Sequence, residues 1–132
     1  MALQYAVAVN NAKLDAIETT VGASAKCMLY SGAVPANCAA AATGTLLANL
    51  VLPADWLAGA ASGSKAKAGA WTGTGAAAGT IGYFRITDTV GTAVGMQGTC
   101  GIGTGDMQFD NTNLTVGQAI TISTFTINAA NT

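Results

Sequence analysis

The chain has 132 residues, of which 51% are hydrophobic and only 8% are charged, with a net charge of −1 and no histidine. Ordinary soluble domains carry about 25% charged residues. The lack of histidine excludes Ser-His-Asp and Cys-His catalysis within this chain, and five scattered basic residues argue against nucleic-acid binding. Because near-zero net charge favours association, the composition indicates a non-enzymatic subunit of an assembly.

The length suits one domain that spans residues 1–132. No stretch approaches the ~20 apolar residues of a membrane-spanning helix, and the first residues lack the basic region of a signal peptide. The cysteines Cys27, Cys38 and Cys100 form no Cys-x-x-Cys pair, so we expect neither a metal nor another cofactor. We expect the three thiols to stay unpaired, as is usual for proteins made in a reducing cytoplasm.

Residues 1–9 are predicted to form an N-terminal arm or edge strand. Within residues 2–9, larger apolar side chains occupy every second position, which is the period of a strand. These side chains, Leu3, Tyr5, Val7 and Val9, are candidate partner-interface residues. An unpaired apolar edge promotes aggregation, so the segment should complete a sheet. That sheet is either its own or a neighbour's, and the low charge favours the neighbour's.

Residues 10–22 are predicted to form a single short helix. Asn10 and Asn11 are suitable N-cap residues, and Gly22 is suited to the C-terminal end. Apolar residues follow the N-cap at spacings of three and four, namely Leu14, Ile17 and Val21. This apolar stripe is narrow, so we expect the helix to lie across the edge or end of a sheet.

After residue 22 the pattern is typical of strands and turns. We expect strands at residues 26–31, 45–52, 81–88, 93–100, 106–110 and 118–128. A turn at residues 89–92 should join two of them into a hairpin. The common core is predicted to contain Leu50, Leu52, Phe84, Ile86, Ile120 and Ile122. The fold class is therefore mainly β, an antiparallel β-sandwich or jelly-roll-like domain with one short N-terminal helix.

Two kinds of side chain are candidate sites. Asp106 and Asp110 lie about 13 Å apart along an extended chain, so we expect them to flank a strand as turn residues and not to form a catalytic pair. Trp56, beside Leu57, is predicted to be in the core. Trp71 is flanked by small residues, and the sequence allows either a core position or a partner-interface position for it.

Several sequence segments, and their order along the chain, are recognisable. They are NNAKLDAIETTVG at 10–22, SGAVPANCAAAATGTLLA at 31–48, LPADWLA at 52–58, ASGSKAKAGAWTGTG at 61–75, GYFRITD at 82–88 and GDMQFDNTNLTVGQAITISTFTI at 105–127. The chain thereby resembles small virion structural proteins of tailed bacteriophages, and is most like capsid cement or decoration proteins. The resemblance implies a jelly-roll architecture without catalytic residues.

The leading hypothesis is a capsid cement protein that binds the major capsid protein and other copies of itself, as a dimer or trimer. It would reside on the capsid exterior after assembly in the host cytoplasm, with neither nucleic acid nor membrane as a partner. One alternative is a phage tail or fibre component. A second is a carbohydrate-binding β-sandwich module that uses Trp56 or Trp71 as a stacking platform.

Overall fold

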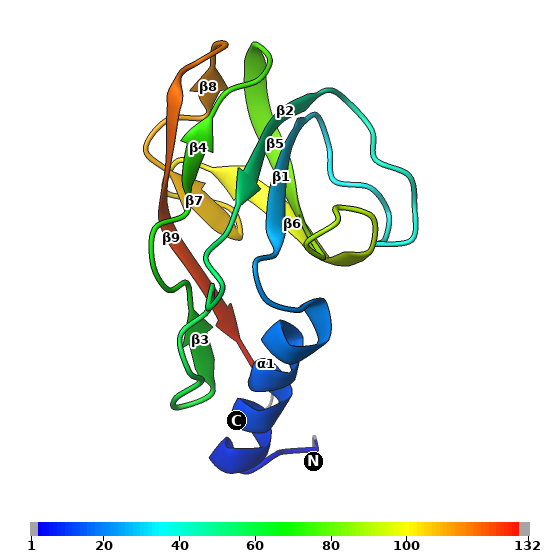
Figure 1. Ribbon diagram of the computed structural model, residues 1–132. Coiled ribbons are helices and arrows are strands. Elements are labelled where there is room, and N and C mark those ends of the chain that lie inside the picture. Colours follow the sequence, from blue (N-terminus) through cyan, green and yellow to red (C-terminus); the bar gives the residue numbers. More distant parts are fainter. Residues whose placement is uncertain (1–2, 130–132) are drawn as a thin grey trace.

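The computed structural model describes residues 3–129, which form one helix and nine strands (Figure 1). The helix is α1 (Val7–Val21). The strands are β1 (Lys26–Ser31), β2 (Leu46–Val51), β3 (Ser64–Ala66), β4 (Thr72–Thr74), β5 (Gly79–Thr87), β6 (Val94–Gly101), β7 (Met107–Phe109), β8 (Asn113–Leu114) and β9 (Ala119–Asn128). The fold is therefore mainly β with one N-terminal helix, as the sequence predicts.

The strands belong to one large curled sheet with the order β2-β1-β5-β6-β7-β9-β3. Its strand pairs are antiparallel except for β6 and β7, which are parallel, so the sheet is mixed. Strand β4 pairs with β9 and lies beside β2, where Gly73 meets the side chain of Leu50. The backbone N–H of Ala76 also donates to the carbonyl oxygen of Leu47 at 2.7 Å. These contacts bring the two ends of the sheet together into a sandwich-like body.

One apolar core fills the interior of the curled sheet. All of the predicted core residues are buried there, namely Leu50, Leu52, Phe84, Ile86, Ile120 and Ile122. Aromatic rings occupy its centre: the Phe84 and Phe125 rings meet edge to face at 5.3 Å, and Trp71 lies 5.5 Å from Phe125. Trp56 is 0% exposed, which confirms its prediction as a core residue.

The outer face of β5 is also buried, because the Ala-rich loop of residues 32–44 covers it. The hydroxyl of Tyr83 donates to the carbonyl oxygen of Thr43 at 2.6 Å. The guanidinium of Arg85, which is 4% exposed, donates to the carbonyl oxygen of Ala40 at 2.7 Å. Hydrogen bonds from these polar side chains therefore hold a loop that has few large apolar groups of its own.

The prediction of a strand at residues 2–9 is wrong for the residues that the structure describes, since α1 begins at Val7 and not at Asn10; residue 2 lies outside them. Ala6 is the extended N-cap, and its carbonyl oxygen accepts from the N–H of Val9 at 3.0 Å. The alanines of this segment favour a helix and outweigh the β preference of its valines. The C-terminal end at Gly22 agrees with the prediction, with φ at 102°.

Candidate functional site

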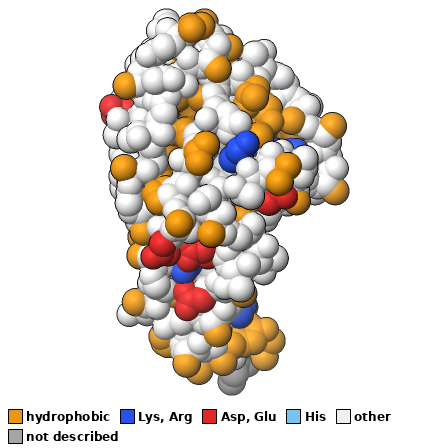
Figure 2. Space-filling view, in the orientation of Figure 1, with side chains coloured by type: hydrophobic (Ala, Val, Ile, Leu, Met, Phe, Trp, Pro, Cys, Tyr) orange, Lys and Arg blue, Asp and Glu red, His pale blue; other side chains and the backbone are white. Residues whose placement is uncertain are grey.

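Helix α1 extends from the β body and carries an exposed apolar tip, formed by Leu3, Tyr5, Val7 and Val9 (Figure 1, Figure 2). Leu3 is 68% exposed, Val7 50% and Val9 45%. Tyr5 is half-buried, with the Lys13 ammonium 4.2 Å from the centre of its ring. Successive residues of a helix are rotated by about 100°, so Val7 and Val9 point to different sides of α1. The apolar tip therefore offers contacts in more than one direction.

A polar stripe on α1 attaches the helix to residues 57–63, the segment that leads into β3. The stripe consists of Asn11, Asp15 and Glu18, which are spaced by four and three residues and so share one side of the helix. The backbone N–H groups of Gly63, Ala60 and Leu57 donate to side-chain oxygens of Asn11, Asp15 and Glu18 at 2.9, 3.0 and 2.7 Å, respectively. These polar contacts fix the helix to the body together with the apolar contacts of Ile17 and Val21 against the core, and they leave the apolar tip free of the core.

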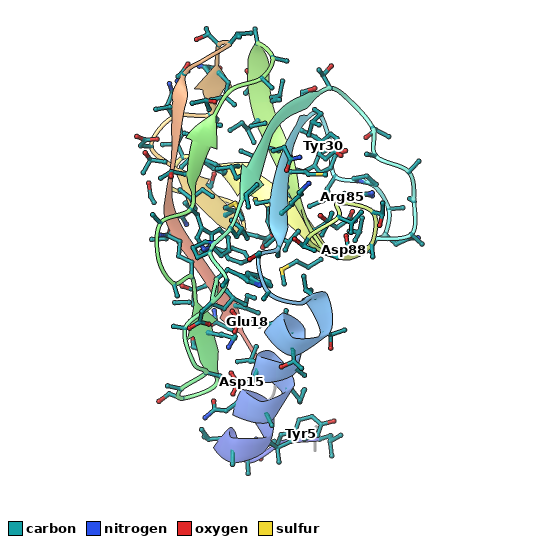
Figure 3. All side chains as sticks on the ribbon, viewed as in Figure 1. Tyr5, Asp15, Glu18, Tyr30, Arg85 and Asp88 are labelled. Atoms are coloured by element: carbon teal, nitrogen blue, oxygen red, sulfur yellow. The ribbon has the colours of Figure 1, made fainter. Side chains whose placement is uncertain are left out.

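Lys65 of β3 completes this attachment. Its side chain is 2% exposed, and its Nζ lies 2.8 Å from Oδ1 of Asp15 and 3.9 Å from Oε1 of Glu18. A buried ammonium is stable only with partners of this kind. The hydrogen bond from Lys65, and then the one from the N–H of Ala60, lower the pKa of Asp15. Figure 3 shows Asp15 and Glu18 on the side of α1 that faces β3.

Three hollows that share lining residues lie between α1 and β6, and we call them together the α1 groove. Its lining residues include Ile17, Thr20 and Val21 of α1, residues 94–97 of β6, and Thr126, Ile127 and Asn128 of β9. The largest part has a volume of about 450 Å³, and Phe84, Met96 and Phe125 contribute apolar surface to it. A Cβ at Gly95 would overlap the side chain of Val21, so glycine permits the helix to approach β6 at this point.

Asp106 closes one end of the α1 groove. Its Oδ2 accepts from the backbone N–H of Thr99 at 2.9 Å and from the hydroxyl of the same residue at 3.1 Å. In return, the N–H of Asp106 donates to the carbonyl oxygen of Thr99 at 3.0 Å. The carboxylate therefore accepts the hydrogen bond of a backbone N–H at the edge of β6, close to the point where β7 begins.

Trp71 is not an interface residue, because it is only 1% exposed. Its Nε1 donates to the carbonyl oxygens of Trp56 and Ala68 at 3.0 and 3.1 Å. The Nε1 of Trp56 donates to the carbonyl oxygen of Gly22 at 2.9 Å. Small residues flank Trp71 in sequence, but the large groups that surround it come from Trp56 and Phe125. Neither tryptophan presents a ring face on which a sugar can stack.

Outside the polar stripe, the carboxylates of Asp88 and Asp106 have structural partners. Asp106 and Asp110 flank β7, as predicted. Oδ1 of Asp88 accepts from the N–H groups of Gly91 and Thr92 at 2.8 and 2.9 Å and so shapes the turn between β5 and β6. These bonds, that from Thr92 foremost, lower the pKa of Asp88. Residues 3–129 contain no group of three or more His, Cys, Asp or Glu side chains that could hold a metal ion.

The three cysteines are free thiols in the structure. Burial raises the pKa of Cys27 to about 12. Burial also raises the pKa of Cys100, with smaller contributions from Cys27 and Asp106. The thiolate is the reactive form, so neither group is prepared for nucleophilic chemistry.

The sequence pattern predicts Leu3, Tyr5, Val7 and Val9 as interface residues, but it predicts neither the polar stripe nor the α1 groove. The spacing of Asn11, Asp15 and Glu18 was an available signal, since a polar face on a short helix needs a partner or water. The groove had no local signal, because it is formed by three segments far apart in sequence.

Within the described part of the chain, no helix is long and apolar enough to span a membrane. A scan against protein-family models and searches of curated proteins and solved structures found no match to this chain. The function is therefore argued from the chain's own residues.

Proposed function

We propose that this chain is a non-enzymatic structural protein of a tailed-phage virion that binds and stabilises the capsid lattice as a cement or decoration protein. The observation that carries the proposal is the apolar tip, which a helix holds away from the β body. Leu3, Val7 and Val9 are exposed at the N-terminal end of α1, whereas the two tryptophans and the three phenylalanines are buried in the core. The other exposed large apolar side chains lie on the β body, namely Leu46, Val51, Val90, Ile102 and Val116. Exposed apolar surface of this kind is a feature of protein–protein contacts.

The low charge supports the same proposal. With 8% charged residues, most of the surface can be buried against a partner without leaving ions unpaired. The proposed partners are the major capsid protein and other copies of this chain, on the capsid exterior, after assembly in the host cytoplasm. Many copies on one lattice would turn a modest affinity per copy into a large gain in particle stability.

Two other functions are separated from this one by different observations. A tail or fibre component would use the same kind of surface at a lower copy number, so stoichiometry distinguishes it. A carbohydrate-binding module would need an exposed aromatic platform, and the burial of Trp56 and Trp71 removes the residues that motivated that hypothesis.

The test is binding of the purified chain to phage capsids that lack it. The wild type should bind at a copy number that matches the capsid lattice and should delay heat disruption of the particle. The double variant Val7→Asp/Val9→Asp should fold but lose binding, since two charges would have to be buried in the contact. Val116→Asp is the matched control, because Val116 is 72% exposed and lies in the loop before β9, outside the apolar tip.

Binding by the Val7→Asp/Val9→Asp variant at wild-type strength would show that the apolar tip is not the contact. Binding of only a few copies per particle, or binding to isolated tails, would replace the cement function with the tail alternative. Failure of the folded wild type to bind either structure would overturn the proposal as a whole.

A further inference from the structure

Strand β6 has one edge that is paired along most of its length and one that is not. It pairs with β5 from Val94 to Thr99, but with β7 only at Cys100 and Gly101. Within residues 3–129, the stretch from 94 to 99 has no strand partner on its second edge. The N–H and C=O of Thr99 are directed to Asp106 on that side. Because these directions alternate along a strand, the backbone groups of Gln97 point into the α1 groove.

The opposite rim of the groove is the end of β9. The carbonyl oxygen of Phe125 accepts from the N–H of Lys67 at 3.0 Å, on the β3 side of β9. By the same alternation, the backbone groups of Thr126 and Asn128 point away from β3. The register of β7 with β9 places Asp106 opposite Thr126, so the groups of Asn128 are the ones that point into the groove. Strand β7 pairs with β9 only as far as Phe125. The groove thus continues the line of β7 between two rims that have no strand partners among the described residues.

We propose that the α1 groove accepts an extended segment from a second copy of this chain, namely residues 3–6. The segment adds a strand between β6 and β9, in line with β7, and forms backbone hydrogen bonds with both rims. Its apolar side chains cover the partly buried Ile17, Met96 and Ile127 in the groove. This mode of recognition is strand addition, in which backbone bonds give affinity and alternate side chains give specificity.

The chemistry of residues 3–6 fits this groove. The segment Leu3-Gln4-Tyr5-Ala6 is uncharged, and Leu3 and Tyr5 lie on one face when it is extended. The groove wall that they would meet includes the partly buried apolar side chains of Ile17, Met96 and Ile127, and the charged groups among its lining residues are Lys13, Asp88 and Asp106. The unpaired edge of β6 spans six residues, about 20 Å, which is enough for a four-residue segment.

The donor must come from another copy because of where α1 places it. Ten residues separate Val7 from Ile17, so about 15 Å of helix lies between the segment and the part of the same chain's groove that β6 and β9 form. The segment leaves the helix at the end opposite the groove, where Leu3 is 68% exposed. In each copy, residues 3–6 therefore lie away from that copy's own groove. The groove can then receive the same segment of another copy. This inference goes beyond the proposed function, since self-association requires no capsid.

The first measurement is sedimentation velocity of the purified protein over a range of concentrations. The wild type should form species heavier than the monomer, and Leu3→Asp/Tyr5→Asp should sediment as a monomer with an unchanged melting temperature. Val116→Asp is again the control, and it should associate like the wild type. A wild type that remains monomeric at all concentrations, or a Leu3→Asp/Tyr5→Asp variant that associates normally, would overturn the inference.

The second measurement locates the acceptor. One chain carries Tyr5→Cys and another carries Thr126→Cys, both in a Cys38→Ser/Cys100→Ala background that melts as the wild type does. The two are mixed and treated with a short bismaleimide, so that a linked pair must join two copies. We expect efficient linkage with Thr126→Cys and little with the control Val116→Cys, which is at a distance from the groove. Equal linkage to both positions would contradict the α1 groove as the acceptor. Because no capsid is present, these results are independent of the capsid-binding test.

Discussion

The Nζ of Lys65 lies 2.8 Å from Oδ1 of Asp15, and this ion pair joins strand β3 to helix α1. Replacing Asp15 with Asn removes the negative partner of an ammonium that is almost fully buried. We therefore expect Asp15→Asn to lower the melting temperature at pH 7, since a buried charge without its partner is unfavourable. Glu18 lies 3.9 Å away and offsets part of the loss. Thermal unfolding followed by circular dichroism measures the effect.

The same pair predicts a dependence of stability on acid. The pKa of Asp15 is lowered from its ordinary value of 3.8, so the unfolded chain binds a proton more readily than the folded one. The stabilisation is complete above about pH 4 and is lost as the pH falls through the lowered pKa. When the pH falls from about 5 to about 2, the melting temperature of Asp15→Asn should decrease less than that of the wild type. Since the pKa of Asp88 is also lowered, comparison should be made in an Asp88→Asn background. Parallel curves for the two proteins would be inconsistent with this assignment.

Truncation of the core is expected to be costly at Phe84 and Ile86, two of the inward-facing residues of β5. Phe84 is 2% exposed and Ile86 0%, so each alanine substitution should lower the free energy of unfolding by about 2–5 kcal/mol. Denaturant titration gives the value directly. Val116→Ala, at a side chain that is 72% exposed, should change it by less than about 0.5 kcal/mol. Near-identical midpoints for Phe84→Ala and the wild type would place this side chain outside the core.

A single methyl group at Gly82 should also destabilise the fold. A Cβ at this position of β5 would overlap the backbone carbonyl oxygen of Gly32, which cannot move away as a flexible side chain would. Overpacking of this kind costs about 1–3 kcal/mol, so Gly82→Ala should shift the denaturation midpoint clearly. Gly59→Ala is the matched control, because a Cβ at Gly59 meets nothing within 4 Å. Equal stability of the two variants would show that the close approach to Gly32 is absent in solution.

The thiols should differ in reactivity. Cys38 lies half-buried in the loop over β5, whereas Cys27 is fully buried with its pKa raised to about 12. In the native protein at pH 8, a thiol reagent should modify Cys38 first and Cys27 only on unfolding, because the thiolate is the reacting form. Mass spectrometry of digested samples identifies the order. Under denaturing, non-reducing conditions all three cysteines should react, and a single reactive thiol would reveal a disulfide.

Much of the sheet could be predicted from local pattern. The expected strands at 26–31 and 118–128 correspond to β1 and β9, and the turn at 89–92 joins β5 to β6 as predicted. Alternation in these long strands reflects a real difference between their faces. Strands β3, β4 and β8 were missed, because they have two or three residues and no alternation. Their pairing is decided by distant strands, chiefly β9 and β5.

The candidate site was less predictable. Val7 and Val9 occupy every second position, which is typical of a strand, but the alanines between them continue the helix toward the N-terminus. Asn10, predicted as an N-cap, instead lies buried inside α1. Lys65 is surrounded by small residues in sequence, and its burial depends on carboxylates 47 and 50 positions earlier. Contacts between residues so far apart in sequence cannot be predicted from the local sequence pattern.

The position of β9 has a consequence for synthesis of the protein. This strand is the partner of β3, β4 and β7, which all precede it in the chain. A ribosome that stalls before residue 119 therefore holds a chain in which three strands have lost their common template. Such a fragment would expose Trp71 and Phe109, and cellular proteases and chaperones recognise exposed apolar groups of this kind. Formation of β3, β4 and β7 therefore depends on synthesis of the one strand that pairs with all three.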